Sequence, residues 1–373
     1  MRASRLLFFA FALEIVSGCG GTVMIPYLAQ PTAPPPVSLL SSAYVESSQT
    51  GLVSMFQVSS TGLWAPTTPA TILSGKLPES LIVSPDGRFV YVANASDSTI
   101  SQFVVNASTG LLSPQDPATV PTGAFPQDLA TDSMGRFVYT ANSNDNTVSI
   151  FTADPQTGTL TAANPAALPV SGIPDGVVVD PFDRFVYVSS GGIINEFSLD
   201  ATSGRLAPIG MVRFGSSGRG FRAAIDPAGR FLYAPAEDQS ELFIFSIDPT
   251  SGALTPASTP TVAAGAGVCS VAIDPSGKYL YAVNRQAGAI SQFSIDPDGS
   301  LTPLPAPLLY DGGDPWQILV DPSGQLAYVS NESTALVEIY RIGPDGQLTW
   351  YSSAPAGSGA GGMAIARSQR PGT

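Results

Sequence analysis

The feature of this sequence that most restricts its fold is a unit of about 47 residues that recurs along nearly the whole chain. A tyrosine within an apolar run recurs at Tyr44, Tyr91, Tyr139, Tyr187, Tyr233, Tyr281 and Tyr328. A glycine in a turn-forming stretch recurs at Gly62, Gly110, Gly158, Gly204, Gly252, Gly299 and Gly346. The two independent landmarks both count seven units.

Each unit reads as four short strands, and residues 78–120 show the pattern most clearly. An apolar run at 81–83 leads into the turn S-P-D-G, in which proline presets φ and glycine accepts a positive φ. Residues 88–93 and 100–105 are rich in β-branched and aromatic residues. A second turn at 106–110 precedes a weaker strand. Four strands at this spacing predict an antiparallel meander.

Seven four-stranded units predict an all-β chain, folded as a seven-bladed β-propeller over residues 39–368 with a tail at 369–373. A β-sandwich would not repeat so evenly, and an open solenoid would need capping repeats. The N-terminal segments 39–45, 52–58 and 63–73 supply three strands of a blade, and residues 362–367 supply a first strand alone. We therefore expect the two ends to share one blade, which removes free sheet edges.

The first 38 residues have the pattern of an export leader followed by a tether. Residues 1–18 contain two arginines and an apolar stretch, and they end in V-S-G directly before Cys19, which resembles the bacterial lipobox. The resemblance implies acylation of Cys19, whereas the alternative is an ordinary secretory signal. Residues 19–38 are proline-rich and predict an extended spacer. We expect a lipid-anchored protein of the bacterial cell envelope, on its periplasmic or surface face.

Composition excludes several kinds of function. The net charge is -13 and the only lysines are Lys76 and Lys278, so no basic stripe exists to bind nucleic acid. The chain has no histidine, which excludes Ser-His-Asp and Cys-His catalysis and most zinc sites. Acid–base chemistry would need Asp, Glu, Arg, Tyr or Cys269, and Cys269 reads as a buried small hydrophobe. We expect neither a cofactor nor a metal.

A site is most plausible where the first strand of each blade enters the central channel. Aligning the blades gives a mouth ring: Glu79, Gln127, Asp175, Phe221, Cys269, Trp316 and Gly361. The ring below it holds Ser80, Asp128, Gly176, Arg222, Ser270, Gln317 and Gly362. This mixture of polar groups predicts either a pocket for a small polar ligand or a water-filled channel. The carboxylates Glu79, Asp128 and Asp175 are either solvated acids or Ca²⁺ ligands.

The repeats S-P-D-G-R-F-V-Y-V-A-N, D-P-S-G-K-Y-L-Y-A-V-N and I-S-Q-F-S-I-D-P resemble those of the lactonase-type seven-bladed propellers. That group includes the propeller form of 6-phosphogluconolactonase, the carboxymuconate cyclases and YVTN-repeat surface proteins. The resemblance covers residues 39–367. In the family that the sequence resembles, activity is associated with a G-P-R-H segment followed by N-E after the second strand of the same blade.

Here the matching segments are Arg219-Gly220-Phe221-Arg222 and Ala236-Glu237, in the least regular blade. Glu237 matches the acid of the family motif, while Phe221 replaces its arginine and Arg222 its histidine. The resemblance implies Glu237 and Arg222 as catalytic residues, with Arg219 nearby.

Two functions remain open. One is a non-catalytic envelope propeller that binds a small polar ligand, a glycan or an envelope protein. The other is a lactonase that hydrolyses a sugar lactone outside the cytoplasm. The leader, the tether and the absent histidine favour the first function. Because the blades bury their own edges, we expect a monomer.

Overall fold

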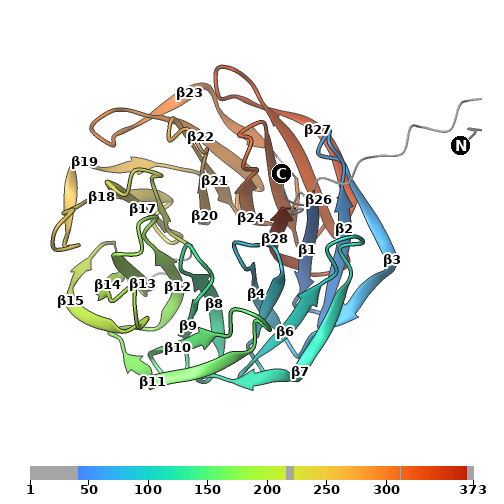
Figure 1. The fold of residues 1–373 in the computed structure, drawn as a ribbon. Coiled ribbons are helices and arrows are strands. Elements are labelled where there is room, and N and C mark those ends of the chain that lie inside the picture. Colours follow the sequence, from blue (N-terminus) through green and yellow to red (C-terminus); the bar gives the residue numbers. More distant parts are fainter. Residues whose placement is uncertain (1–40, 216–221, 311, 368–373) are drawn as a thin grey trace, which may run out of the picture. The chain divides into compact units, whose positions relative to one another are not determined.

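The computed structural model describes residues 41–215, 222–310 and 312–367. Arg219 and Cys19, both singled out above, lie outside these residues. By internal contacts the chain divides into Met1–Val37 and Ser38–Thr373, and the description below concerns the second unit. It consists of seven four-stranded antiparallel sheets, and the described residues contain no helix. The sheets form a ring whose first strands are innermost (Figure 1).

Blades one to six each use four consecutive strands, so the predicted all-β seven-bladed propeller is confirmed. The strands of blades one to three are β4 Pro78–Val83, β5 Phe89–Asn94, β6 Thr99–Val105, β7 Leu112–Pro121, β8 Pro126–Thr131, β9 Phe137–Asn142, β10 Thr147–Ala153, β11 Leu160–Pro169, β12 Pro174–Val179, β13 Phe185–Ser190, β14 Ile193–Leu199 and β15 Leu206–Arg213. Those of blades four to six are β16 Ala224–Ile225, β17 Phe231–Ala236, β18 Glu241–Ile247, β19 Leu254–Ala263, β20 Val268–Ile273, β21 Tyr279–Asn284, β22 Ala289–Ile295, β23 Leu301–Tyr310, β24 Pro315–Val320, β25 Leu326–Asn331, β26 Leu336–Ile342 and β27 Leu348–Pro355.

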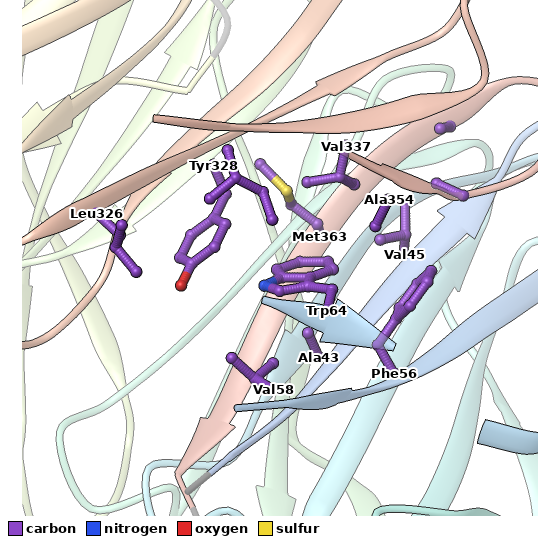
Figure 2. Packing of buried hydrophobic residues seen from close by; sticks show 13 residues of the cluster. Ala43, Val45, Phe56, Val58, Trp64, Leu326, Tyr328, Val337, Ala354 and Met363 are labelled. Carbon is purple, nitrogen blue, oxygen red and sulfur yellow. The ribbon is translucent and has the colours of Figure 1, made fainter. Parts of the chain in front are cut away.

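Blade seven closes the ring by combining the two ends of the propeller, as predicted. Its order is β28 (Ala360–Arg367), β1 (Ser41–Ser47), β2 (Leu52–Val58) and β3 (Trp64–Leu73). Strands β28 and β1 pair antiparallel, with Tyr44 opposite Ala364. Between blades six and seven, Trp64 packs its ring 5.0 Å from Tyr328 and 5.3 Å from Phe56, measured between ring centroids (Figure 2).

The repeated tyrosines and glycines join successive blades. Each tyrosine hydroxyl from Tyr44 to Tyr281 donates to the carbonyl of the turn glycine in the next blade, for example Tyr91 to Gly158 at 2.5 Å. Gly158 has a φ of 72°, and a β-carbon there would lie 2.4 Å from the Phe89 ring. Glycine is therefore required both by backbone conformation and by the aromatic ring packed against it.

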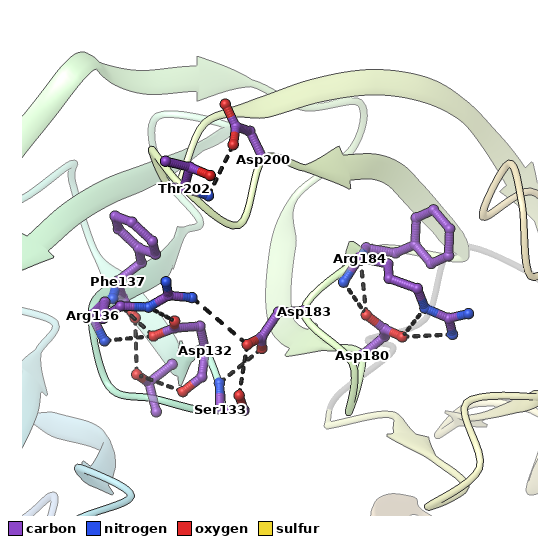
Figure 3. Close-up of polar contacts among 12 residues, drawn as sticks. Asp132, Ser133, Arg136, Phe137, Asp180, Asp183, Arg184, Asp200 and Thr202 are labelled. Carbon is purple, nitrogen blue, oxygen red and sulfur yellow. Dashed lines mark hydrogen bonds and ion pairs between the residues drawn. The ribbon is translucent and has the colours of Figure 1, made fainter.

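In blades two to six the turn between the first and second strands is fixed by an aspartate. In blade two, buried Asp132 accepts from the backbone N–H groups of Arg136 and Phe137, and Arg136 Nε donates to its second oxygen at 2.9 Å (Figure 3). Blade three carries Asp183 where other blades have glycine, with a φ of 55°. Its carboxylate accepts from the backbone N–H of Ser133 at 2.8 Å, so this departure from the repeat ties blade three to blade two.

Candidate functional site

Five of the mouth-ring residues sit at irregularities in the innermost strands. In β4, β8, β12, β20 and β24 the pairing with the second strand shifts register at the second residue of the strand. Those residues are Glu79, Gln127, Asp175, Cys269 and Trp316. A β-bulge turns a side chain away from the direction that regular alternation would give it, and bulges are common beside functional sites. Glu79 and Trp316 are partly exposed, whereas Gln127, Asp175 and Cys269 are buried.

Arg222 reaches across the channel from blade four, just before the two-residue strand β16. Its Nε donates to Oδ1 of Asp128 in blade two at 3.2 Å, and its Nη2 donates to the carbonyl of Glu79 in blade one at 2.9 Å. Its Nη1 is buried with no hydrogen-bond partner among the described residues. The structure therefore brings together Arg222, Asp128 and Glu79, which come from three different blades.

Several inner-ring side chains hold neighbouring blades together. Asp128 also accepts from Ser80 Oγ at 2.9 Å and from the Val177 N–H at 3.1 Å, which links blades one, two and three. Ser270 Oγ accepts from the Ile318 N–H at 3.5 Å, and Gln317 Oε1 accepts from the Met363 N–H at 2.6 Å. The sequence predicts that these polar groups face either a ligand or a water-filled channel, and in the structure they also make hydrogen bonds that join first strands.

Glu46 belongs to this site, although sequence reasoning missed it. It is 1% exposed in β1 and accepts a hydrogen bond from the Gly362 N–H through Oε1, while its Oε2 has no partner among the described residues. Burial raises the pKa of Glu46 well above its ordinary value. The Gly362 N–H and Arg222 oppose that increase in pKa, while Glu79 and Glu332 add to it. Burial therefore favours the protonated form of Glu46 to a higher pH than for an exposed glutamate.

The repeat contained a signal for Glu46. Its position, two residues after the repeated tyrosine, is occupied in the other blades by Ala93, Ala141, Ser189, Pro235, Val283 and Ser330. A glutamate among small or apolar residues marks a departure from what packing alone requires.

Charged residues also gather at the end of the second strand in blades four, five and six, where Glu237, Arg285 and Glu332 occupy one repeat position. Arg285 Nε donates to Asp314 at 2.6 Å, its Nη2 donates to Glu332 at 2.6 Å, and its guanidinium lies 4.4 Å from the Trp316 ring centroid. Burial raises the pKa of Glu332, as does Asp314, and Arg285 opposes both.

The two residues implied as catalytic do not contact each other. No hydrogen bond or ion pair joins Glu237 to Arg222, both of which lie in the described part of the chain. Glu237 is partly buried, and its charge acts on Cys269. Burial, with a further contribution from Glu237, raises the pKa of the Cys269 thiol to about 12, so this free cysteine stays protonated and is a poor nucleophile.

A pocket of about 580 Å³ lies away from the channel mouth. Its lining residues include Asp86, Met134, Arg136 and Asp154, which lie in turns that follow the first or the third strand of a blade. Ser84, another lining residue, follows the end of β4, whereas Glu79 stands at its start. The pocket is therefore at the opposite end of the first strands, among the turn contacts drawn in Figure 3.

Within the described ranges, no group of three or more Cys, Asp or Glu side chains is arranged to hold a metal ion.

Comparison with known families identifies the fold family. A family model described as "Lactonase, 7-bladed beta-propeller" matches residues 42–172, 169–272 and 256–364, which is most of the chain. The chain belongs to this lactonase family of seven-bladed propellers. The family membership inferred from the repeats is thus confirmed. A search of curated proteins found no match.

Solved structures of similar shape cover the whole propeller of this lactonase-family member. A candidate 6-phosphogluconolactonase of Bacteroides uniformis matches with a TM-score of 0.77 and 23% identity, covering 88% of this chain and 100% of that one. The periplasmic gluconolactonase PpgL of Pseudomonas aeruginosa matches with a TM-score of 0.74 and 16% identity, covering 88% and 100%. At these identities the likeness establishes the fold.

No helix in the described segments has the length and apolar character needed to span a bilayer.

Proposed function

We propose that this protein binds a small, hydroxyl-rich molecule of the sugar-lactone class at the mouth of its axial channel. The observation that carries the proposal is Arg222, held across the channel by Asp128 and by the Glu79 carbonyl, with Nη1 buried and unpartnered among the described residues. A few convergent polar groups together with an aromatic ring, here Trp316, are typical of sites for sugar-sized ligands.

The test is calorimetric titration of the full-length chain, in detergent, with stable neutral sugar lactams, which mimic lactones without hydrolysing. We expect saturable binding that weakens at least about tenfold in Arg222→Lys, because lysine cannot reproduce the forked guanidinium contacts. Arg205→Lys, a solvent-facing arginine of blade three bonded to the Asn164 carbonyl, is the control. No binding by the wild-type protein would end the proposal.

A second candidate function is hydrolysis of the same lactone, favoured by family membership and by Glu237 at the family's acid position. In that reaction Glu237 takes a proton from a water molecule, and the oxygen of that water bonds to the lactone carbonyl carbon. The bond from that carbon to the ring oxygen then breaks, and the proton passes to the ring oxygen to give an open hydroxy acid. Release of acid from a δ-lactone, faster with wild type than with Glu237→Gln or Arg222→Ala, would support it. A rate equal to spontaneous hydrolysis would exclude it.

We also propose that the protein acts as a lipid-anchored monomer on the outer side of a bacterial cytoplasmic membrane or at the cell surface. This proposal rests on Cys19 and the leader before it, and on the proline-rich residues 19–38. The location would place the channel mouth in contact with solutes of the envelope.

A further inference from the structure

The pocket at the far end of the first strands is a feature that the proposed function does not explain. Its volume of about 580 Å³ lies within the range of ligand sites in proteins. It is formed by turns of blades one, two and three, and its lining includes Asp86, Met134, Arg136 and Asp154. Because it is separate from the channel mouth, lactone binding there does not account for it.

The first turns of blades two and three carry exposed apolar side chains. Met134 is 69% exposed and Phe182 is 57% exposed. The two turns touch, because the Ser133 N–H donates to Asp183 at 2.8 Å. At the same turn position, blades one and four to six have polar or small residues, namely Asp86, Ala228, Ser276 and Ser323. Packing within a blade therefore does not require an apolar residue there, and a flexible methionine is common on surfaces that bind a partner.

The Arg136 side chain offers a hydrogen-bond donor at this pocket. In blades one and three the matching arginines donate to backbone carbonyls in the third turn of the next blade, as Arg88 does to Pro155 at 3.0 Å. No such bond joins Arg136 to the third turn of blade three among the described residues. Its Nη2 lies instead 3.9 Å from Asp183, which replaces the turn glycine of that blade (Figure 3). Because the side chain is 37% exposed, a carbonyl that enters the pocket would find a donor there.

The charge around the pocket is negative. The charged side chains that line it, or bond directly to residues that do, are Asp86, Asp132, Asp154, Asp183, Asp200, Arg88 and Arg136. Hydrogen bonds from the Thr157 and Gln156 N–H groups lower the pKa of Asp154 and favour its ionised form. Since carboxylates outnumber arginines here, a cation is attracted to the pocket and an anion is repelled.

We propose that this pocket is a docking site for a lysine- or arginine-bearing segment of a partner protein. The cation of that segment lies beside Asp154, its aliphatic stem packs on Met134, and one of its backbone carbonyls accepts from Arg136. Lysine and arginine combine a long apolar stem with a terminal charge, which matches the apolar and acidic groups of this pocket together. The inference goes beyond lactone binding at the mouth and does not rest on it.

The test is calorimetric titration of the full-length chain in detergent with two peptides, Gly-Lys-Leu-Lys-Gly and Gly-Glu-Leu-Glu-Gly. Each peptide is acetylated and amidated, so that only its side chains are charged. Salt at about 150 mM screens attraction to the rest of the acidic surface. We expect the lysine peptide to bind with a dissociation constant on the order of 100 μM or tighter, and at least about tenfold more tightly than the glutamate peptide.

Asp154→Asn tests the acidic part of the pocket. The variant removes the charge but keeps an oxygen that accepts from the turn N–H groups, and it should weaken binding of the lysine peptide by about fivefold. Asp248→Asn is the matched control, because Asp248 accepts the equivalent N–H bonds in the third turn of blade four, outside the pocket. We expect this control to leave the affinity unchanged.

Met134→Ser tests the apolar part of the pocket. Loss of the side chain that covers the stem should weaken binding of the lysine peptide by about fivefold. Met211→Ser is the control, because Met211 is an exposed methionine of β15 that does not line the pocket. The substituted side chains in both pairs of variants are exposed, so these variants test binding and not folding.

Weaker binding in Asp154→Asn and Met134→Ser, but in neither control, supports the docking site. Absence of binding by the lysine peptide, or equal affinity for the two peptides, overturns it. An equal loss in Asp154→Asn and Asp248→Asn also overturns it, because the attraction would then come from the net charge of the chain. None of these results bears on lactone binding at the channel mouth.

Discussion

At the scale of single residues, the most informative side chain is one that breaks the repeat. Six blades place a small or apolar residue two positions after the repeated tyrosine, and blade seven places Glu46 there. It is buried, it accepts only one N–H among the described residues, and it lies beside Gly362, as Arg222 does. A side chain that packing does not require, in an unfavourable environment for its charge, is a candidate for function.

The raised pKa of Glu46 gives a prediction about stability and pH. Between the ordinary glutamate pKa, about 4.3, and the raised value in the fold, the folded state keeps a proton that the unfolded state releases. Raising the pH through this window therefore destabilises the wild type, by about 1.4 kcal/mol per pH unit at most. Glu46→Gln cannot ionise, so we expect it to match wild type near pH 4 and to exceed it by a growing margin above pH 5.

Chemical denaturation of both proteins at several pH values measures this difference. Glu332, whose pKa burial also raises, is present in both proteins and acts on Glu46 only in the wild type. A constant difference in unfolding free energy across pH 4 to about pH 8 would contradict a buried neutral Glu46.

At the scale of elements, the repeat is a set of contacts between blades as much as a pattern within them. The tyrosine and the glycine, which serve in the sequence as separate landmarks, are hydrogen-bonded to each other across the blade boundary. In blades two to six the glycine also packs against the aromatic ring that begins the second strand of the preceding blade. These shared requirements explain why both residues recur with the same spacing.

Gly158→Ala tests this contact. The new β-carbon would lie 2.4 Å from the Phe89 ring at a φ of 72°, so steric overlap adds to the strain of a positive φ. We expect a loss of about 2–4 kcal/mol of stability. Gly312→Ala is the matched control, because its φ is 80° and nothing lies within 4 Å of the added atom. Gly312→Ala should lower the free energy of unfolding by about 1 kcal/mol.

Both unfolding free energies come from the same denaturant titration. Equal losses in the two variants would show that backbone strain alone, without the aromatic contact, accounts for the glycine.

At the scale of the whole molecule, ring closure is the property on which the channel site depends. Strand β28 joins blade seven to β1, carries Gly361 and Gly362, and brings them beside Glu46 and Arg222. Strand β28 supplies the innermost strand of blade seven, so all seven sheets have four strands. The channel site around Arg222 therefore depends on the closed ring.

Deletion of residues 360–373 should prevent stable closure. The loss exposes the β1 edge and removes Met363 from the core between blades six and seven (Figure 2). We expect aggregation, or a fall in melting temperature of more than about 10 °C. Deletion of 368–373 alone, which spares β28, is the control and should melt like the full chain. Similar melting of the two deletion proteins would show that β28 contributes little to closure.

The anchoring proposal predicts a change in fractionation. Cys19→Ala removes the thiol that would be acylated, so the protein should move from the membrane fraction to the soluble fraction of the cell envelope. Cys269→Ala, which changes the buried free cysteine, should stay with the membranes. Release of both variants, or of neither, would contradict acylation at Cys19.

The sequence by itself determined the number of blades, the four strands in each and the closing partnership of the two ends, because each depends on local patterns of turns and alternating apolar residues that repeat. It also identified Arg222 and Asp128 as channel residues from their position in the repeat. Only the tertiary structure decided how those residues meet. Arg222 pairs with Asp128 rather than Glu237, and Glu46 reaches the same point as Gly362, more than 300 residues away in the chain. Such contacts are set by the curvature of the closed ring and by bulges at the strand starts, which no local pattern encodes.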